Sequence, residues 1–235
     1  MTFRQFAIGL TACFALAWST MVVIPFFAMR SPSPVRFEEG VDAKEGLYHP
    51  KRAGRVVNGA AVYAANGCYQ CHTQVVRPTY AGNDMGRPDF GGIKGDPDRG
   101  DTRRESNVFD YVGLDFAPIG VTRLGPDLMN VGRRVRAEHG VNAASYLFQH
   151  LYNPRLIPSL ATNSSSCPSF SFLFETQEIK GQPSDEALDV PVADGFQIVP
   201  GQKARALVDY LMSLQHDDEV PSSMNYAPAG TDKEG

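Results

Sequence analysis

Two cysteines and a histidine stand together in the segment NGCYQCHTQ, residues 66–74, and their spacing suits three kinds of chemistry. Cys68 and Cys71 are separated by two residues, and His72 follows directly. A redox-active dithiol, half of a zinc site and the attachment point of a covalent haem all use cysteines at this spacing. The surrounding sequence has to decide among them.

The Cys-x-x-Cys-His order is the attachment signature of haem c. One helical turn can present both sulfurs to the vinyl groups along one edge of the porphyrin, while His72 projects to the iron as the proximal ligand. A zinc site would need a second Cys or His pair, and a thioredoxin-like dithiol would follow a strand in a βαβ pattern. The sequence contains neither pattern, so we expect one covalent haem c and single-electron transfer.

A long uncharged stretch, Phe6 to Met29, precedes this motif. It has 24 residues, and about 20 apolar residues span a bilayer as a helix. We expect residues 1–30 to be an uncleaved anchor and not a secretory signal, because the apolar run is long and no small-x-small cleavage site follows it. Cys13, in LTAC, resembles a lipidation site, but cleavage there would leave most of the apolar run attached. Because haem c is attached outside the cytoplasm, the motif predicts a periplasmic haem domain on a bacterial inner membrane.

The elements that must position the motif can be read from local patterns. Apolar spacing predicts a helix over 55–67 that runs into Cys68, and a second amphipathic helix over 201–215. Between them, a turn at Gly125–Pro126 precedes a short helix, and Asn142 is expected to cap a helix over 143–152 that Pro154 ends. The remaining segments are expected to be irregular: a linker at 31–54, surface insertions at about 79–115 and 176–198, a polar loop at 156–175 and a disordered tail at 217–235.

Composition limits the function classes. The chain of 235 residues has 43% hydrophobic residues, enough for a folded core, and a net charge of −4, which argues against nucleic-acid binding as its main function. Four cysteines, at 13, 68, 71 and 167, are too few for a disulfide-dense scaffold. The acidic balance favours an electron donor with a basic face.

With these residues in hand, the chain resembles a known family. GAAVYAANGCYQCH, then RLGPDL, then a C-terminal amphipathic helix follow the order of elements in class I cytochromes c. The segments GCYQCHTQVVRP, TRLGPDLMNVGRR, HLYNPR and CPSFSFLFE look like the membrane-anchored mono-haem cytochrome c subunit of cbb3-type cytochrome c oxidases. The resemblance implies an all-α fold: a single N-terminal transmembrane helix, then a class I cytochrome c domain over 55–216 with the two long loop insertions.

The resemblance also implies residue roles. Cys68 and Cys71 would hold the haem vinyl groups and His72 the iron, while the Pro126 carbonyl would accept a hydrogen bond from the other nitrogen of His72. Arg77 would pair with a haem propionate or a partner subunit, or be an ordinary solvated arginine. The same roles are possible for Arg155, in YNPR.

The distal side of the iron departs from the family pattern. Where the family has methionine in a Met-Pro-Ser-Phe loop, this chain has Cys167. Cys167 as a thiolate ligand is one alternative, and Met129, close to the Gly-Pro turn in sequence, is another. His139, His150, Met85 and Met212 are candidates by residue type alone, and an open or water-bound iron is the remaining alternative.

The predicted haem motif, membrane anchor and iron ligands are compatible with three functions. The first is an electron-transfer subunit of a membrane terminal oxidase, which relays electrons from a donor cytochrome toward the oxygen-reducing catalytic subunit and other membrane subunits. This chain would not itself reduce oxygen, because a single transmembrane helix cannot hold a multi-histidine haem–copper site. The alternatives are a free-standing membrane-anchored cytochrome c shuttle and a haem-based redox or gas sensor.

Overall fold

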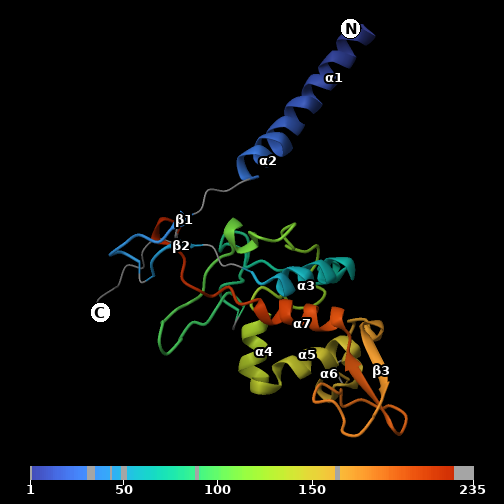
Figure 1. Ribbon diagram of the computed structural model, residues 1–235. Coiled ribbons are helices and arrows are strands. Elements are labelled where there is room, and N and C mark those ends of the chain that lie inside the picture. Colours follow the sequence, from blue (N-terminus) through green and yellow to red (C-terminus); the bar gives the residue numbers. More distant parts are fainter. Residues whose placement is uncertain are drawn as a thin grey trace. The chain divides into compact units, whose positions relative to one another are not determined.

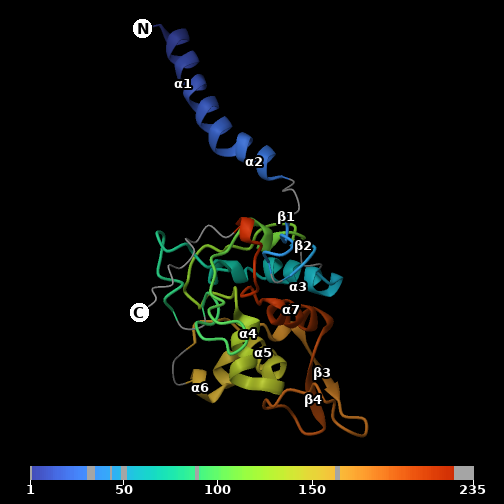
Figure 2. The same ribbon diagram turned by 90° about the vertical axis from the view of Figure 1, so that its left-hand side faces the viewer.

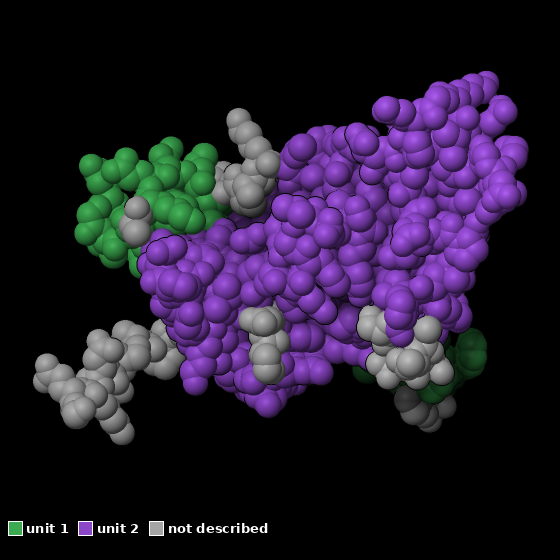
Figure 3. Space-filling view, turned by 90° about the horizontal axis from the view of Figure 1, so that it is seen from below, with its two compact units in different colours: residues 1–49, 220–235 green, residues 50–219 purple. Residues whose placement is uncertain are grey.

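The computed structural model describes residues 2–30, 35–42, 44–48, 52–87, 90–161 and 165–224. The chain forms two units, which Figure 3 colours separately. Unit 1 comprises Met1–His49 and Val220–Gly235, and unit 2 comprises Pro50–Glu219. The part of the expected tail from 225 onward lies outside the described residues.

A continuous apolar helical segment fills most of the N-terminal part of unit 1. It consists of α1 (Phe3–Trp18), a π-helical turn (Ser19–Val23) and α2 (Ile24–Met29). Thr2 and Gln5 form a reciprocal capping box at its start. Within the described residues, Phe3–Met29 is one helix long and apolar enough to cross a membrane, and its most apolar 18-residue window has a mean hydropathy of 2.0. This length and composition agree with the anchor expected at 1–30.

The expected linker at 31–54 contains a small antiparallel pair, β1 (Val35–Arg36) with β2 (Leu47–Tyr48). Phe37 packs edge-on against the buried Tyr48. This aromatic contact gives the segment a local structure that its Pro- and Gly-rich composition did not predict. Residues 31–34, 43 and 49–51 of the expected linker are outside the described residues.

The regular secondary structure of unit 2 is mostly helical, as predicted. Its helices, in chain order, are α3 (Gly54–Ala65), α4 (Val131–His139), α5 (Ala143–Tyr152), α6 (Pro158–Ala161) and α7 (Gln202–Ser213). Short 3₁₀ turns lie at Cys68–Gln70, Val108–Tyr111, Gly140–Asn142, Pro154–Leu156 and Ser171–Leu173, with one more in unit 1 at Ser222–Met224. The helices predicted over 55–67, 143–152 and 201–215 are therefore confirmed within one or two residues at most ends.

The first and last helices of unit 2, α3 and α7, lie side by side in both views (Figures 1 and 2). Gly59 allows their backbones to approach, since a Cβ there would stand 2.0 Å from the Ala206 carbonyl oxygen. Tyr63 and Tyr210 pack across this crossing with ring centroids 5.6 Å apart. Leu207 is fully buried in the same core. This close pair forms the base on which α4 and α5 complete the core.

The start of α5 differs from the prediction. Asn142 precedes the helix, but its side chain makes no capping hydrogen bond. Instead, a 3₁₀ turn over Gly140–Asn142 joins α4 directly to α5. The helix therefore begins where predicted, but without a side-chain cap from Asn142.

Two strands interrupt the expected all-α fold. β3 (Phe174–Glu178) pairs antiparallel with β4 (Phe196–Pro200), in a register that sets Thr176 opposite Ile198. The second excursion, expected at 176–198, is thus the long connection of a β-hairpin. Ile198 and Val199 are buried, so β4 is held to unit 2 by its apolar side chains.

The insertion expected at about 79–115 is not confined to the surface. Asp84, Phe90 and Asp110 within it are buried. Arg104 binds Asp110 at 2.7 Å and Asp218 at 3.1 Å, and this joins the insertion to the residues that follow α7. Ionic pairing of buried carboxylates orders a segment whose Gly, Asp and Pro content indicated a surface loop.

Candidate cofactor site

The predicted attachment motif lies at the C-terminal end of α3. Gly67 adopts a left-handed conformation, with φ of 68°, and this turns the chain out of the helix and into the 3₁₀ turn. The backbone N–H of His72 then donates to the Cys68 carbonyl at 3.0 Å. Cys68, Cys71 and His72 consequently line the same cavity.

His72 is held by the turn that the sequence analysis singled out. Its Nδ1 lies 2.7 Å from the Pro126 carbonyl oxygen, which makes Nδ1 the donor and leaves Nε2 as a potential metal ligand. Gly125 lies against the imidazole, where a Cβ would stand 2.2 Å from Cε1. The ring is therefore fixed both by a hydrogen bond and by close contact with backbone.

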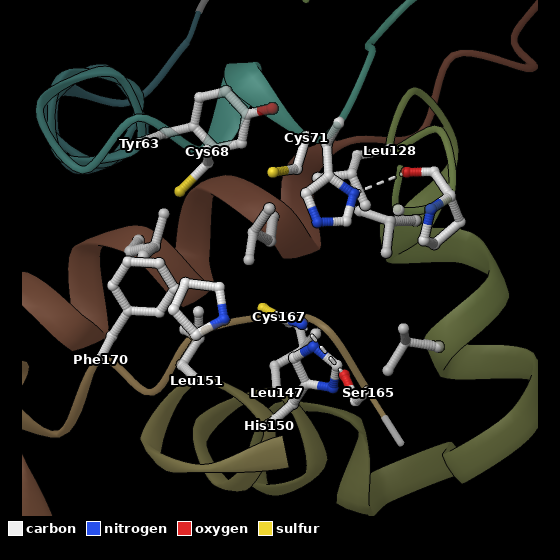
Figure 4. A pocket seen from close by; sticks show the side chains of 18 of the residues that line it. Tyr63, Cys68, Cys71, Leu128, Leu147, His150, Leu151, Ser165, Cys167 and Phe170 are labelled. Atoms are coloured by element: carbon white, nitrogen blue, oxygen red, sulfur yellow. Dashed lines mark hydrogen bonds between the residues drawn. The ribbon is translucent and has the colours of Figure 1, made fainter. Parts of the chain in front are cut away.

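The cavity has a volume of about 550 Å³, within the range of sites that hold small molecules or cofactors. Figure 4 shows its interior, with Cys68 and Cys71 on one wall and Cys167 and His150 on the wall opposite. Most of the lining is apolar and comes from α4, α5, α7 and nearby loops: Leu128, Val131, Val135, Leu147, Leu151, Phe170, Leu207 and Leu211. These properties suit a large, mostly apolar group with a few polar contacts.

The thiols that face the cavity are free. Burial, with Cys167 as the second cause, raises the pKa of Cys68 to about 12. Burial also raises the pKa of Cys167, with Cys71 as the next cause. Both thiols are therefore protonated at neutral pH.

Of the distal ligand candidates, the structure brings Cys167 and His150 to the cavity. His150 Nδ1 is buried and has no hydrogen-bond partner among the described residues. Burial, with the His72 ring as the second cause, lowers the pKa of His150 to about 4, so its imidazole is neutral at pH 7.

The other distal candidates lie elsewhere in the part of the chain that the structure describes. Met129 is almost fully buried beside the Gly-Pro turn, but it does not line the cavity. His139 stacks on Tyr146 at 3.9 Å between ring centroids, outside the lining. Met85 and Met212 are not lining residues either. Position in the fold therefore separates candidates that residue type alone could not.

Arg77 does not line the cavity but binds a buried carboxylate. Its Nη2 lies 2.9 Å from Asp84 Oδ1, and Arg123 Nη1 lies 2.7 Å from the same oxygen. Burial disfavours the charge on Asp84, but the hydrogen bonds from Arg123 and Arg77 outweigh it and hold the pKa of Asp84 well below its usual range. Arg77 thus helps to order the start of the insertion. Arg155 is exposed and also lies outside the lining.

Several polar lining residues were not predicted from the sequence, among them Tyr63, Arg134 and Glu138. Arg134 and Glu138 share one face of α4 with Val131 and Val135, at helical spacings of three and four residues. The pattern in VGRRVRAEH contained this signal, but it could not indicate which face would meet the cavity. The Arg134 guanidinium also donates to the Asp127 carbonyl.

The cavity side chains do not converge on a single point. Across the described ranges, no three His, Cys, Asp or Glu side chains lie together as a group that could hold a metal ion directly. The candidate ligands instead face one another across the cavity, an arrangement that fits a flat cofactor between them better than a bare ion. In comparisons with known proteins, no protein-family model matches the sequence, and no curated protein matches it.

Proposed function

We propose that this chain is a membrane-anchored mono-haem cytochrome c, in which Cys68 and Cys71 attach the haem and His72 binds its iron. The observation that carries the proposal is that all three motif residues line one apolar cavity of about 550 Å³, with His72 oriented by the Pro126 carbonyl. That hydrogen bond leaves Nε2 for the iron and increases its basicity. A dithiol or a zinc half-site would need neither the cavity nor the oriented imidazole.

The remaining cavity residues fit the same group. The apolar side chains of α4, α5 and α7 would contact the two faces of the porphyrin. Arg134 supplies a positive charge in the lining, suited to a propionate, and Tyr63 supplies a hydroxyl. The bound haem would supply reversible one-electron chemistry, while the protein controls its ligands and excludes water.

We further propose that the chain is the electron-transfer subunit of a cbb3-type terminal oxidase. The resemblance of GCYQCHTQVVRP, TRLGPDLMNVGRR and HLYNPR to that subunit supports the assignment, together with the apolar helix Phe3–Met29. In this role the haem domain faces the periplasm of a bacterial inner membrane. It accepts electrons from a donor cytochrome and passes them toward the oxygen-reducing subunit.

Covalent haem attachment is tested by producing the full chain in a bacterium that loads haem c, and by staining a denaturing gel for haem. We expect stain on the wild-type chain and none on the Cys68→Ala/Cys71→Ala double variant. Cys13→Ala, which changes an exposed cysteine of α1, is the matched control and should stain like the wild type. A wild-type chain without stain, in a host that loads a reference cytochrome c, would contradict the proposal.

The oxidase assignment has its own test, since a free-standing shuttle would give the same stained gel. Mild detergent extraction from the native membrane, followed by affinity purification of this chain, should recover copper and b-type haem in fixed proportion to haem c. Purification of haem c alone would favour the shuttle. Electron delivery from a basic donor should slow as salt is added, because salt screens the attraction to this acidic chain.

A further inference from the structure

The cavity wall opposite the attachment cysteines includes a histidine placed by α5. Tyr146, Leu147, His150 and Leu151 all line the cavity, with the helical spacing of one face. His150 lies in the last turn of α5, two residues before the helix ends at Tyr152. Leu147 and Leu151 on the same face are buried in the core, so this part of the helix is held by packing.

The His150 imidazole makes few contacts with the residues that the structure describes. Its Nδ1 is buried and without a hydrogen-bond partner among the described residues, and its only ring contact there is a tilted one with Tyr146 at 6.0 Å. A buried polar atom without a partner is uncommon in folded proteins. In a histidine that lines the cavity, it shows that Nδ1 is not committed to a hydrogen bond elsewhere among the described residues.

Two ligand-type side chains, Cys167 and His150, lie on this wall, across the cavity from Cys68 and Cys71 (Figure 4). His150 belongs to α5, whose neighbouring Leu147 and Leu151 are packed into the core, whereas Cys167 belongs to a segment without regular secondary structure. Side chains on a packed helix are positioned more precisely than side chains on loops, so His150 is the better placed of the two to hold an iron.

We propose that His150, together with His72, would hold the iron of the haem, and that Cys167 lines the cavity without binding the metal. This inference rests on the proposed function, because it concerns the iron of the haem that Cys68 and Cys71 would attach. It replaces the expected thiolate at the methionine position with a second imidazole. A Cys at position 167 would then act as a small apolar contact.

The test compares three variants of the full-length haem-loaded chain in detergent by low-temperature EPR of the oxidised state. Cys167→Ser should leave the low-spin signal of the wild type unchanged. His150→Ala should abolish that signal and give a high-spin iron or a new ligand type. His139→Ala is the matched control, a histidine of the neighbouring helix outside the cavity lining, and should behave like the wild type.

His150→Met is a second variant, which tests the ligand even if His150→Ala loses its signal because the protein unfolds. Methionine keeps a ligand at the same position but favours reduced iron, so the reduction potential should rise and a methionine–iron absorption band should appear. A thiolate-type signal in the wild type that disappears in Cys167→Ser would overturn the inference, as would a His150→Ala spectrum identical to the wild type. In either case the haem remains attached, whereas loss of haem from the wild-type chain overturns the proposed function itself.

Discussion

Replacing Gly59 with alanine should destabilise unit 2, because this glycine sits where α3 crosses α7. The added Cβ would stand 2.0 Å from the Ala206 carbonyl oxygen and 2.6 Å from Tyr210 Cβ. Ordinary van der Waals contacts of a Cβ begin near 3.4 Å. Neither obstacle is the far end of a flexible side chain, so the two helices would have to move apart by more than about 1 Å.

The expected cost follows from that separation. Overpacking of a dense core costs about 1–3 kcal/mol, and a clash with backbone falls at the upper end of that range. Alanine also gains about 1 kcal/mol over glycine in helix propensity, so the net loss should be about 2 kcal/mol. For a unit of this size, such a loss lowers the melting temperature by about 4–8 °C.

Gly54→Ala is the matched control on the same helix. Gly54 is the first residue of α3, and a Cβ there would meet nothing within 4 Å. Urea unfolding of the full-length chain in detergent, followed by circular dichroism, should show Gly54→Ala at or above wild-type stability and Gly59→Ala well below it. If the two variants unfold within about 0.5 kcal/mol of each other, the close helix crossing is not a determinant of stability.

Three further perturbations address the site and its surroundings. Gly125→Ala should push the His72 ring from its place, because the added Cβ would stand 2.2 Å from Cε1; visible spectra of the loaded chain should then show altered iron ligation, and an unchanged spectrum would contradict this contact. The depressed pKa of Asp84 means that its contribution to stability is present above the unfolded value of about 3.9 and is lost as pH falls through the lower folded pKa. Asp84→Asn should therefore flatten the acid limb of unfolding free energy against pH, and an equally steep limb would refute the linkage. Tyr210→Phe removes the 2.7 Å hydrogen bond to Gln74 Oε1 in the core and should cost about 1 kcal/mol in thermal unfolding, whereas a neutral change would show that the bond contributes nothing.

The helices were predictable where local pattern and packing agree. In α7, apolar residues recur at helical spacing, and Ala204, Leu207 and Leu211 are buried as that spacing indicates. The hairpin was not predictable in the same way, because four of the five residues of β3 are exposed and FETQE shows no apolar alternation. Its pairing with β4 depends on a partner about twenty residues away, which no local rule identifies.

The candidate site was also predictable only where its residues are close together in the sequence. Cys68, Cys71 and His72 are adjacent in sequence, so their common direction follows from one turn of chain. The far wall depends on how α4 and α5 pack, and residue type alone could not separate His150 from His139. Likewise, the partner of Arg104 at Asp218 is 114 residues away, so the order of the insertion could not be read from its composition.

The crossing of α3 and α7 also sets the order of folding events. About 140 residues separate the two helices, so closing this contact belongs among the slow, non-local steps of folding. Leu207 and Leu211 of α7 form part of the cavity wall, so the cavity is incomplete until α7 has docked. Before that step Cys68 and Cys71 are more accessible than in the folded protein, which gives an enzyme that modifies them a period of easier access.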